Sequence, residues 1–369
     1  MPSIEGVLTG TAKRGIVVGV CLEGFPRDRR SRFFRTAGVR GNQNLQLSCD
    51  SYEWRNRSYE SYDHRRLDLS DSPNPTRIVD AHQHVFWHKK NDAGLVQDLD
   101  EHGIEYAWLL TWEIPPSEDC ASYHIAFNPT HVRPDGTHAG IPLVDLLTAR
   151  DNYPDRFVVG YCPHPAMGNP SALLRSAVEI HDVKVCGEWK CQMPIDDPRC
   201  LELFRTAGEL GLPVTFHLDI PYLADEDGKM KYQSIWYGGT VDNLERTLKA
   251  CPDTTFIGHA PGFWREISDD ADRQTVMYPR GPVTGKGRLY GLFDRYSNLW
   301  ADLSAGSALY ALNRDPENAM EFLATYSDRL LFARDYYGKE LHEFLQTLDL
   351  SREITEKIYH LNAETLVAR

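Results

Sequence analysis

The feature of this sequence that most constrains its fold is the regular alternation of strand-like and helix-like segments from residue 77 onward. Short apolar segments such as FVVGY (157–161) and PVTFH (213–217) predict buried strands, and the longer mixed segments between them predict helices. Strands that are joined through helices pair in parallel, because a helical crossover returns the chain to the same end of the sheet. The alternation therefore predicts a parallel α/β fold.

This alternation contains eight strand–helix units. The predicted strands are 78–81, 105–111, 157–161, 183–190, 213–217, 255–259, 299–303 and 329–335. The predicted helices are 93–102, 143–152, 170–181, 198–211, 241–250, 285–296, 316–326, 338–348 and 351–368. Eight such units in about 290 residues match the size of a closed (β/α)8 TIM barrel. An open, doubly wound sheet is the alternative, but that fold usually carries a glycine-rich phosphate loop where this chain has His82-Gln83-His84.

Residues 1–76 differ from the rest of the chain in composition. Arginines cluster between residues 27 and 40, and a polar run with little periodicity extends from residue 42 to residue 75. We expect an N-terminal extension, poorly structured or loosely docked, followed by the barrel at residues 77–369. A wrongly assigned start codon would produce the same pattern. We assign the extension no chemistry and predict that it is dispensable.

Composition argues against several classes of partner. A formal net charge of −13 argues against nucleic acid, because phosphate binding draws on clustered lysines and arginines. No apolar run approaches the length of about 20 residues that spans a membrane. The eight cysteines include no C-x-x-C pair, as expected for reduced thiols, and we predict a cytoplasmic protein. The expected partner is a small-molecule substrate, and a homo-oligomer is left open.

Polar side chains recur where the predicted strands end, which is where barrels of this kind build their active sites. His82 and His84 follow the first strand, and strand alternation would place them on one face together with Asp80. Two neutral imidazoles on one side suit zinc and related metals, although paired histidines can also be ordinary hydrogen-bonded residues. The other polar residues at strand ends are Trp112, Glu113, His164, Glu188, Lys190, His217, His259, Ser304 and Asp335.

The order of these residues resembles a known family. His-x-His after the first strand, one histidine after each of the fifth and sixth strands, and an aspartate after the eighth resemble the amidohydrolase superfamily, in particular its amidohydrolase-2 branch. The segments that carry the resemblance are IVDAHQHVFW, GEWKCQMPIDDP, LPVTFH, FIGHAPGFW and RLLFARDYYG. The resemblance begins at residue 77 and leaves the N-terminal extension unmatched. It implies a TIM barrel and a metal-binding enzyme, either a hydrolase such as a lactonase or a decarboxylase or hydratase.

The resemblance also implies which residues bind the metal. His82, His84, His217 and Asp335 would hold one divalent cation, with zinc (Zn) expected and manganese (Mn) or another divalent ion as the alternative. His259 would either ligate a metal or stand beside the substrate as an acid or electrostatic aid. The site would hold one or two ions.

The fourth strand leaves two interpretations open. Members of the family place a carboxylated lysine or a glutamate there, and this chain offers Glu188 and Lys190 on one face of the strand. Glu188 as a ligand would permit a second metal ion. Alternatively, Glu188 and Lys190 form a buried ion pair near the barrel mouth. His164, after the third strand, is a further candidate for contact with a second metal or with the substrate.

Two reactions fit these residues. A metal-activated water would attack a lactone, ester or amide carbonyl, with Asp335 taking the proton and His259 steadying the oxyanion. Alternatively, a cation would chelate the carboxylate and hydroxyl of an aromatic or unsaturated acid that loses carbon dioxide, which is a lyase reaction. A barrel that only binds a ligand is a third hypothesis, against which the complete ligand set argues, because unused buried ligands cost stability. We expect a hydrolase.

Long loops are predicted to overhang the barrel mouth at 219–239 and 263–286. The second of these contains Arg265, Arg280 and Lys286, which could meet a carboxylate on the substrate or could simply be solvated.

Overall fold

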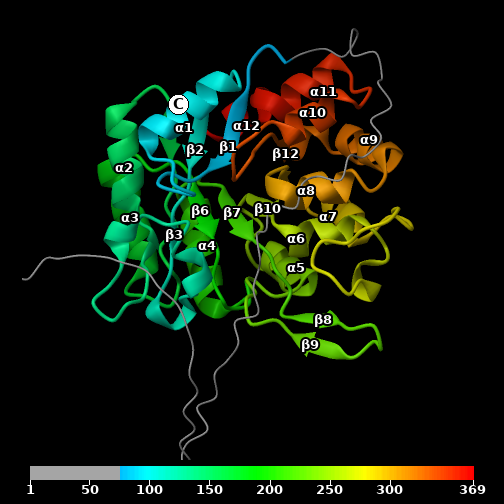
Figure 1. Ribbon diagram of the computed structural model, residues 1–369, viewed down its shortest axis with the longest axis horizontal. Helices are drawn as coiled ribbons and strands as arrows, with labels where there is room; N and C mark the ends of the chain where they lie inside the picture. Colours follow the sequence, from blue (N-terminus) through cyan, green and yellow to red (C-terminus); the bar gives the residue numbers. More distant parts are fainter. Residues whose placement is uncertain (1–74) are drawn as a thin grey trace, which may run out of the picture. The chain divides into compact units, whose positions relative to one another are not determined.

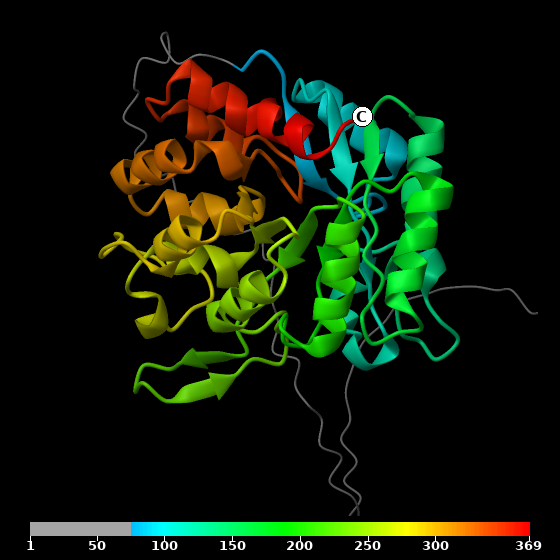
Figure 2. The same ribbon diagram turned by 180° about the vertical axis from the view of Figure 1, so that it is seen from behind.

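Eight parallel strands form the centre of the fold, and helices surround them (Figures 1 and 2). The computed structural model describes residues 75–369. One sheet has the strand order β1 (Val79–Gln83), β2 (Tyr106–Leu109) and β5 (Phe157–Val159). The other has the order β6 (Cys186–Trp189), β7 (Val214–His217), β10 (Phe256–His259), β11 (Leu299–Asp302) and β12 (Leu330–Leu331).

Backbone hydrogen bonds join the two sheets at both edges. Where β5 ends and β6 begins, the N–H of Tyr161 donates to the carbonyl of Val185 at 2.8 Å. On the opposite side, where β12 meets β1, the N–H of Asp335 donates to the carbonyl of His82, also at 2.8 Å. The eight strands therefore close into a barrel, which confirms the predicted (β/α)8 TIM-barrel fold class.

The barrel interior is filled by apolar side chains, as the alternation of residues along short buried strands predicts. The interior residues are Val79, Ala81, Tyr106, Trp108, Leu110, Val158, Val185, Ile257, Leu331 and Ala333. Ala363 and Val367, near the carboxyl terminus, pack against the same cluster, and the guanidinium of Arg369 lies 4.5 Å from the ring centroid of Tyr106, the first residue of β2. The carboxyl terminus therefore covers the end of the barrel at which the strands begin.

Helices follow the strands in the order that the alternation predicts. They are α1 (Asp92–Glu101), α2 (Leu143–Asn152), α3 (Pro170–His181), α4 (Pro198–Glu209), α5 (Val241–Ala250), α7 (Arg288–Arg295), α9 (Pro316–Thr325) and α10 (Glu340–Gln346). Three of them, α2, α3 and α5, have the bounds predicted from the sequence. The final predicted helix, 351–368, is divided into α11 (Arg352–Glu356), a π-helical turn (Lys357–Leu361) and α12 (Asn362–Leu366).

The structure also contains short elements that the sequence did not predict. In the loop after β2, β3 (Trp112–Glu113) pairs with β4 (Gly140–Ile141), and in the loop after β7, β8 (Tyr222–Ala224) pairs with β9 (Met230–Tyr232). The second hairpin projects from the barrel, as both ribbon views show. Strands of two or three residues are too short for a periodic pattern. Two further helices, α6 (Pro261–Trp264) and α8 (Ala305–Leu312), follow β10 and β11.

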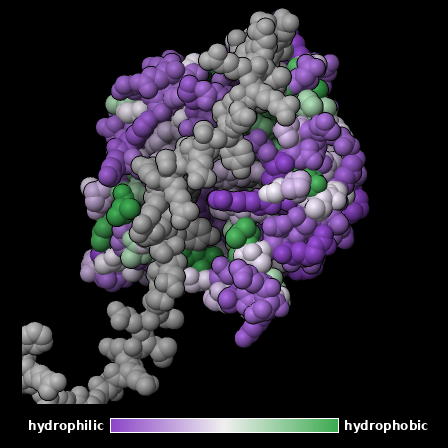
Figure 3. Space-filling view, turned by 45° about the vertical axis from the view of Figure 1, so that its right-hand side comes forward, coloured by the Kyte–Doolittle hydropathy of each residue, from purple (hydrophilic) through white to green (hydrophobic). Residues whose placement is uncertain are grey.

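One face of the described part is mostly polar where it is visible. On the face in Figure 3, hydrophobic side chains form small separate patches in a largely hydrophilic surface. From residue 75 onward, no helix is both long enough and apolar enough to cross a bilayer. The six cysteines of this range are buried and unpaired. The N-terminal extension predicted for residues 1–76 lies, apart from its last two residues, outside the described residues.

Candidate metal centre

The candidate ligands meet at the carboxyl ends of the strands. His82 lies in β1, Glu188 lies in β6, and His217 and His259 end β7 and β10. Asp335 follows β12 with its backbone in the left-handed region (φ 56°), which aspartate tolerates better than most residues. Five segments that are far apart in the sequence therefore bring these side chains to one end of the barrel.

One expectation about β1 is wrong: Asp80 does not share a face with His82. The pairing register against β2 shifts between Asp80 and Gln83, which interrupts the alternation of side chains. The neighbours of Asp80 on both sides belong to the barrel interior, whereas Asp80 accepts a hydrogen bond from Arg334 Nε (2.7 Å). The Arg334 guanidinium also pairs with Asp98 of α1 (2.8 Å), so Asp80 faces the layer between strand and helix.

His82 and His84 are each held through one ring nitrogen. The Nδ1–H of His82 donates to Asp302 Oδ2 (2.9 Å), and the Nδ1–H of His84 donates to the carbonyl of Leu110 (2.8 Å). In each ring Nε2 is left facing Glu188 Oε2, at 3.9 Å from His82 and 3.4 Å from His84. A ring that is fixed through Nδ1 leaves Nε2 as the atom that can bind a metal, as in metal-ligating histidines.

In His217 the two ring nitrogens have exchanged roles. Its Nδ1 faces Glu188 Oε1 at 2.8 Å, and its Nε2 contacts Asp219 Oδ2 at 2.9 Å. Asp219 also accepts a hydrogen bond from the N–H of Gly262 (3.3 Å). Only glycine fits at position 262, because a Cβ there would lie 2.3 Å from the carbonyl oxygen of Leu218. Nδ1 is therefore the atom that His217 presents to the other ligands.

Asp302 orients a second histidine besides His82. Its Oδ1 lies 3.1 Å from Nδ1 of His259 and accepts the hydroxyl hydrogen of Ser304 at 2.6 Å. Burial alone would raise the pKa of Asp302, but the adjacent His259 and His82 hold it well below its usual range. With Nδ1 occupied, His259 directs Nε2 at Asp335 Oδ2, 3.4 Å away.

Glu188 and Asp335 are the carboxylates at the centre of this cluster. Burial opposes the ionisation of Glu188, yet the charge of Lys190 and the hydrogen bonds of the surrounding imidazoles hold its pKa well below the usual range. Burial likewise opposes the charge of Asp335, and here the imidazoles, led by His82, hold the pKa well below the usual range. Both groups are therefore carboxylates, the form that binds cations, at neutral pH.

The same contacts raise the pKa of two of the imidazoles. Burial opposes the charge of His84, but the nearby carboxylates of Asp335 and Glu188 raise its pKa to about 9. Burial opposes the charge of His259 as well, and Asp302 together with Asp335 raises its pKa to about 10. Both rings therefore carry two protons at neutral pH unless a cation replaces one of them.

Three overlapping sets of side chains within residues 75–369 have ligand atoms that all lie within 4.8 Å of one another. The sets are His82, His84 and Glu188; Glu188, His217 and His259; and His82, His259 and Asp302. His82 Nε2 and Glu188 Oε2 are buried, and neither has a hydrogen-bond partner among the described residues. Buried polar atoms are rarely left unpaired, and nitrogen and carboxylate donors suit zinc and its neighbours. The residues therefore fit a divalent metal ion.

Lys190 and His164 belong to none of these sets. Among the described residues Lys190 has no carboxylate within 4.0 Å, so the ion pair with Glu188 is not formed, and its Nζ lies 3.9 Å from the ring centroid of Trp112. Both ring nitrogens of His164 are occupied: Nε2 contacts Glu118 Oε1 (3.0 Å), and Nδ1 accepts the N–H of Ala166 (3.2 Å). His164 therefore holds the loops around it together.

Three aromatic residues, Trp87, Trp112 and Tyr237, lie in a row from His84 to His217. We call them the aromatic arc. The ring centroid of Trp87 is 5.8 Å from that of His84 and 6.4 Å from that of Trp112. The ring centroid of Tyr237 is 6.0 Å from that of Trp112 and 5.2 Å from that of His217. The aromatic arc (Trp87, Trp112 and Tyr237) therefore runs along one side of the centre.

Two of the three cationic residues named in the loop after β10 have partners in the protein. Arg265 is buried, and its Nη2 donates to the carbonyl of Gln274 at 3.3 Å. Lys286 pairs with Glu321 at 2.6 Å, and Arg280 is exposed. Of these three, the first two have protein partners of their own.

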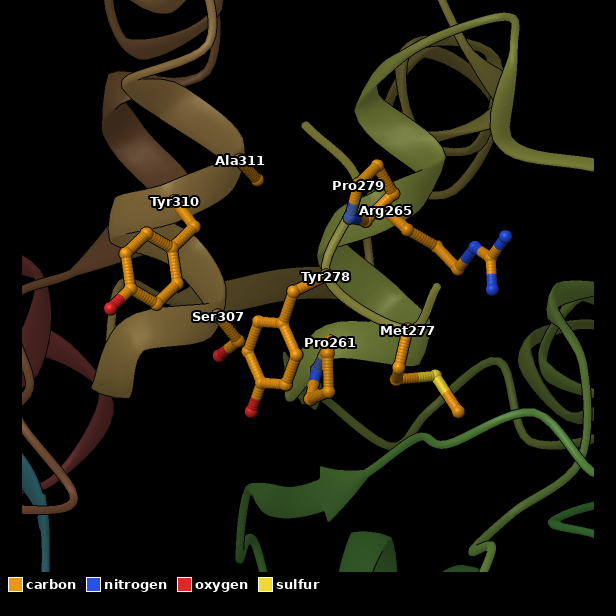
Figure 4. Close-up of a pocket in the computed structure, with 8 residues that line it drawn as sticks. All are labelled: Pro261, Arg265, Met277, Tyr278, Pro279, Ser307, Tyr310 and Ala311. Carbon is orange, nitrogen blue, oxygen red and sulfur yellow. The ribbon is translucent and has the colours of Figure 1, made fainter. Parts of the chain in front are cut away.

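A small cavity lies beside this loop, against helix α8 (Figure 4). Its volume of about 10 Å³ is roughly that of one water molecule. Tyr278 and Tyr310 line it with their ring centroids 5.9 Å apart, and the guanidinium of Arg265 points away from both rings. The cavity is too small for a substrate, since ligand pockets usually have volumes of about 300 Å³ or more.

Two residues of the centre were not among the candidates from the sequence. Asp302 is the last residue of β11, and Asp219 follows His217 by two positions. A carboxylate at a strand end is the signal that identified Asp335, and it would have identified Asp302 as well. That both residues hold imidazoles in place follows only from the distances in the structure.

Known structures share this fold. No family model and no curated protein matches the sequence. An uncharacterised TIM-barrel protein from Bordetella bronchiseptica matches with a TM-score of 0.51 and 17% identity, over 79% of this chain and 98% of that one. A Staphylococcus aureus protein named as a putative amidohydrolase (TM-score 0.49, 16% identity, 79% and 100% coverage) and a 2,6-dihydroxybenzoate decarboxylase (0.48, 15%, 80% and 98%) follow. Residues 75–369 therefore form a TIM barrel.

Proposed function

We propose that this chain is a metal-dependent hydrolase of the amidohydrolase type, which acts on the carbonyl of a small lactone, ester or amide. The observation that carries the proposal is the pair of buried, unpartnered atoms His82 Nε2 and Glu188 Oε2 within a cluster of imidazoles. The order of ligands along the sequence and their position at the strand ends of a TIM barrel support the same assignment.

Different residues of the centre would bind the cation, accept the proton and stabilise the negative charge during hydrolysis. A divalent cation, when bound, supplies a water that ionises near neutral pH and a positive charge for the substrate oxygen. Asp335 Oδ1 faces His84 Nε2 (3.3 Å), on the side of the ligands, and Oδ2 faces His259 Nε2 (3.4 Å). Asp335 can therefore act as a ligand through one oxygen and accept a proton on the other. His259, fixed by Asp302 at Nδ1, would hold a cation through Nε2 close to the substrate oxygen as it becomes negative.

Glu188 favours hydrolysis over decarboxylation. It belongs to two of the three ligand sets, so its two oxygens can contact two cations at once. Two-cation centres are suited to reactions in which one oxygen attacks and another leaves, whereas the loss of carbon dioxide involves no attacking oxygen. We therefore propose that the centre would hold two ions, zinc or manganese, and that Glu188 would be a ligand in both sets.

The reaction can be identified by a screen of the purified protein after metal analysis. Sugar lactones and aromatic carboxylates are offered separately, and the release of acid and of carbon dioxide is followed in parallel. We expect acid release from a lactone, its loss after chelation, and its recovery with zinc or manganese. Release of carbon dioxide from an aromatic or unsaturated acid, with every lactone untouched, would show that the lyase is right and the hydrolase wrong.

The number of ions can be tested at His259, which lies in the set that contains Glu188 and His217. His259→Asn should lower the metal content of the protein, measured by elemental analysis, from two ions per chain toward one. His342→Asn is the control, because His342 contacts Tyr359 and belongs to none of the ligand sets found in the described residues. An unchanged metal content would mean that His259 acts on the substrate alone.

A further inference from the structure

We propose that Lys190 forms an anion-binding subsite beside the metal centre, which takes a carboxylate of the substrate whose apolar body lies along the aromatic arc. The inference rests on the proposed function for the carbonyl that reacts, and it assigns the part of the substrate that does not react. No bond is made or broken at Lys190, which is a specificity-determining residue.

The first observation is that Lys190 forms no ion pair with any of the described residues. It is half-buried, and none of the carboxylates that the structure describes lies within 4.0 Å of its Nζ. Its Nζ instead lies over two rings of the aromatic arc, 3.9 Å from the centroid of Trp112 and 5.4 Å from that of Tyr237. Ring faces stabilise an ammonium ion without neutralising its charge, so the charge remains available to a ligand.

The second observation is the position of this charge next to the candidate ligands. Lys190 is two residues from Glu188, and its charge is the largest of the influences that favour the ionised form of that carboxyl. The ring of Tyr237, which Lys190 faces, is 5.2 Å from the ring of His217. The Tyr237 ring therefore neighbours both Lys190 and a candidate ligand, so an anion held at Lys190 would lie near the cluster, within the reach of a small substrate.

The third observation is that two of the other three cations considered for this role have protein partners, and the third, Arg280, is exposed. Arg265 is buried and donates to a backbone carbonyl, and Lys286 pairs with Glu321. Lys190 thus has no ion-pair partner among the described residues and also lies close to the centre. A carboxylate pairs well with such an ammonium ion, and an apolar or aromatic body gains further contact with the neighbouring rings.

The test uses benzoate as the probe, because it joins a carboxylate to a flat ring and has no bond that the proposed reaction would break. Calorimetric titration of the full-length, metal-loaded protein should show that Lys190→Met weakens benzoate binding by about tenfold or more. Benzamide, which has the same shape without the charge, should bind the wild type and Lys190→Met equally. Acetate should bind the wild type more weakly than benzoate does.

Lys286→Met is the matched control, because it also removes a lysine that lies over a tyrosine ring, 5.0 Å from the centroid of Tyr290. It should leave benzoate binding unchanged. Lys190→Gln provides a second variant in case Lys190→Met fails to fold, which circular dichroism would reveal.

Two results would overturn the proposal. One is benzoate binding that is equally tight in the wild type and both Lys190 variants, which would mean that the anion binds to the metal alone. The other is no binding of benzoate to the wild type. Metal-depleted wild type should still bind benzoate more tightly than metal-depleted Lys190→Met. Because the probe is not turned over and metal content is measured separately, failure to find hydrolysis would not affect either result.

Discussion

The two oxygens of Asp335 face different imidazoles, and this division predicts what the residue contributes. Asp335→Asn keeps the shape of the side chain while it removes a charged ligand and the proposed base. Lactone turnover should fall by about 10² or more, the order associated with positioned acid–base groups, and the metal content should fall with it. Initial rates and elemental analysis would measure the two effects.

A suitable control for this change is Asp349→Asn, because Asp349 is exposed and lies in a loop outside the centre. It should retain full turnover and full metal content. Wild-type turnover in Asp335→Asn would contradict both the ligand and the base assigned to this residue.

Protons on two imidazoles compete with the metal. The pKa of His84 is raised to about 9 and that of His259 to about 10, so both rings are protonated at pH 7 in the metal-free protein. Metal binding at pH 7 should therefore release about one to two protons, and metal affinity should rise as the pH rises toward these values. Calorimetry in two buffers of different ionisation enthalpy would measure the release, and identical heats in both buffers would contradict it.

Individual elements could be predicted where their ends are fixed by local hydrogen bonds. Helix α3 begins as predicted, because the side chain of Asn169 accepts the N–H of Ala172 and Pro170 suits the first helical turn. All these groups are neighbours in the sequence, so the signal is visible in it. Short apolar segments, which are equally local, predict the strand ends and with them the positions of His217 and His259.

Other elements depend on partners that are distant in the sequence. The two residues of β3 form a strand only because Trp112 pairs with Ile141 and Glu113 pairs with Gly140. The bulge that separates Asp80 from the centre depends on β2, and the position of Lys190 over Trp112 depends on the loop that begins at β3. No periodicity in the sequence encodes these contacts. The candidate ligands could therefore be named from the sequence, but the residues that hold their other ring nitrogens could not.

The link between β12, β1 and α1 is predicted to carry much of the stability of the closing seam. Arg334 is buried and pairs with Asp80 (2.7 Å) and Asp98 (2.8 Å). Arg334→Met would leave buried Asp80 without its cation, whereas Asp98 would keep Lys90 (2.7 Å), and breaking such a buried pair costs about 3–5 kcal/mol of unfolding free energy. Urea unfolding would measure the loss.

The control for this variant is Arg352→Met, whose side chain is 70% exposed and forms a surface ion pair with Glu356 at 3.7 Å. Its effect on the unfolding free energy should stay within about 0.5 kcal/mol. Equal effects of the two substitutions would show that the buried link adds nothing beyond an exposed pair.

At the scale of the whole molecule, the hydrogen bonds that close the barrel all lie within residues 75–369. A chain that lacks residues 1–74 should therefore retain the melting temperature and the metal content of the full chain. Thermal unfolding followed by circular dichroism, together with elemental analysis, would test this. An insoluble or metal-free truncation would show that the N-terminal extension is structural.

The seam between β12 and β1 also determines when the candidate ligands can come together. During synthesis His82 leaves the ribosome early, whereas Asp335, which bonds to the His82 carbonyl, appears only after β12 has been made. Contacts between such distant parts of a chain form late in folding. A growing chain therefore lacks Asp335 until β12 has been made, so the candidate ligands can meet only when the barrel is nearly complete.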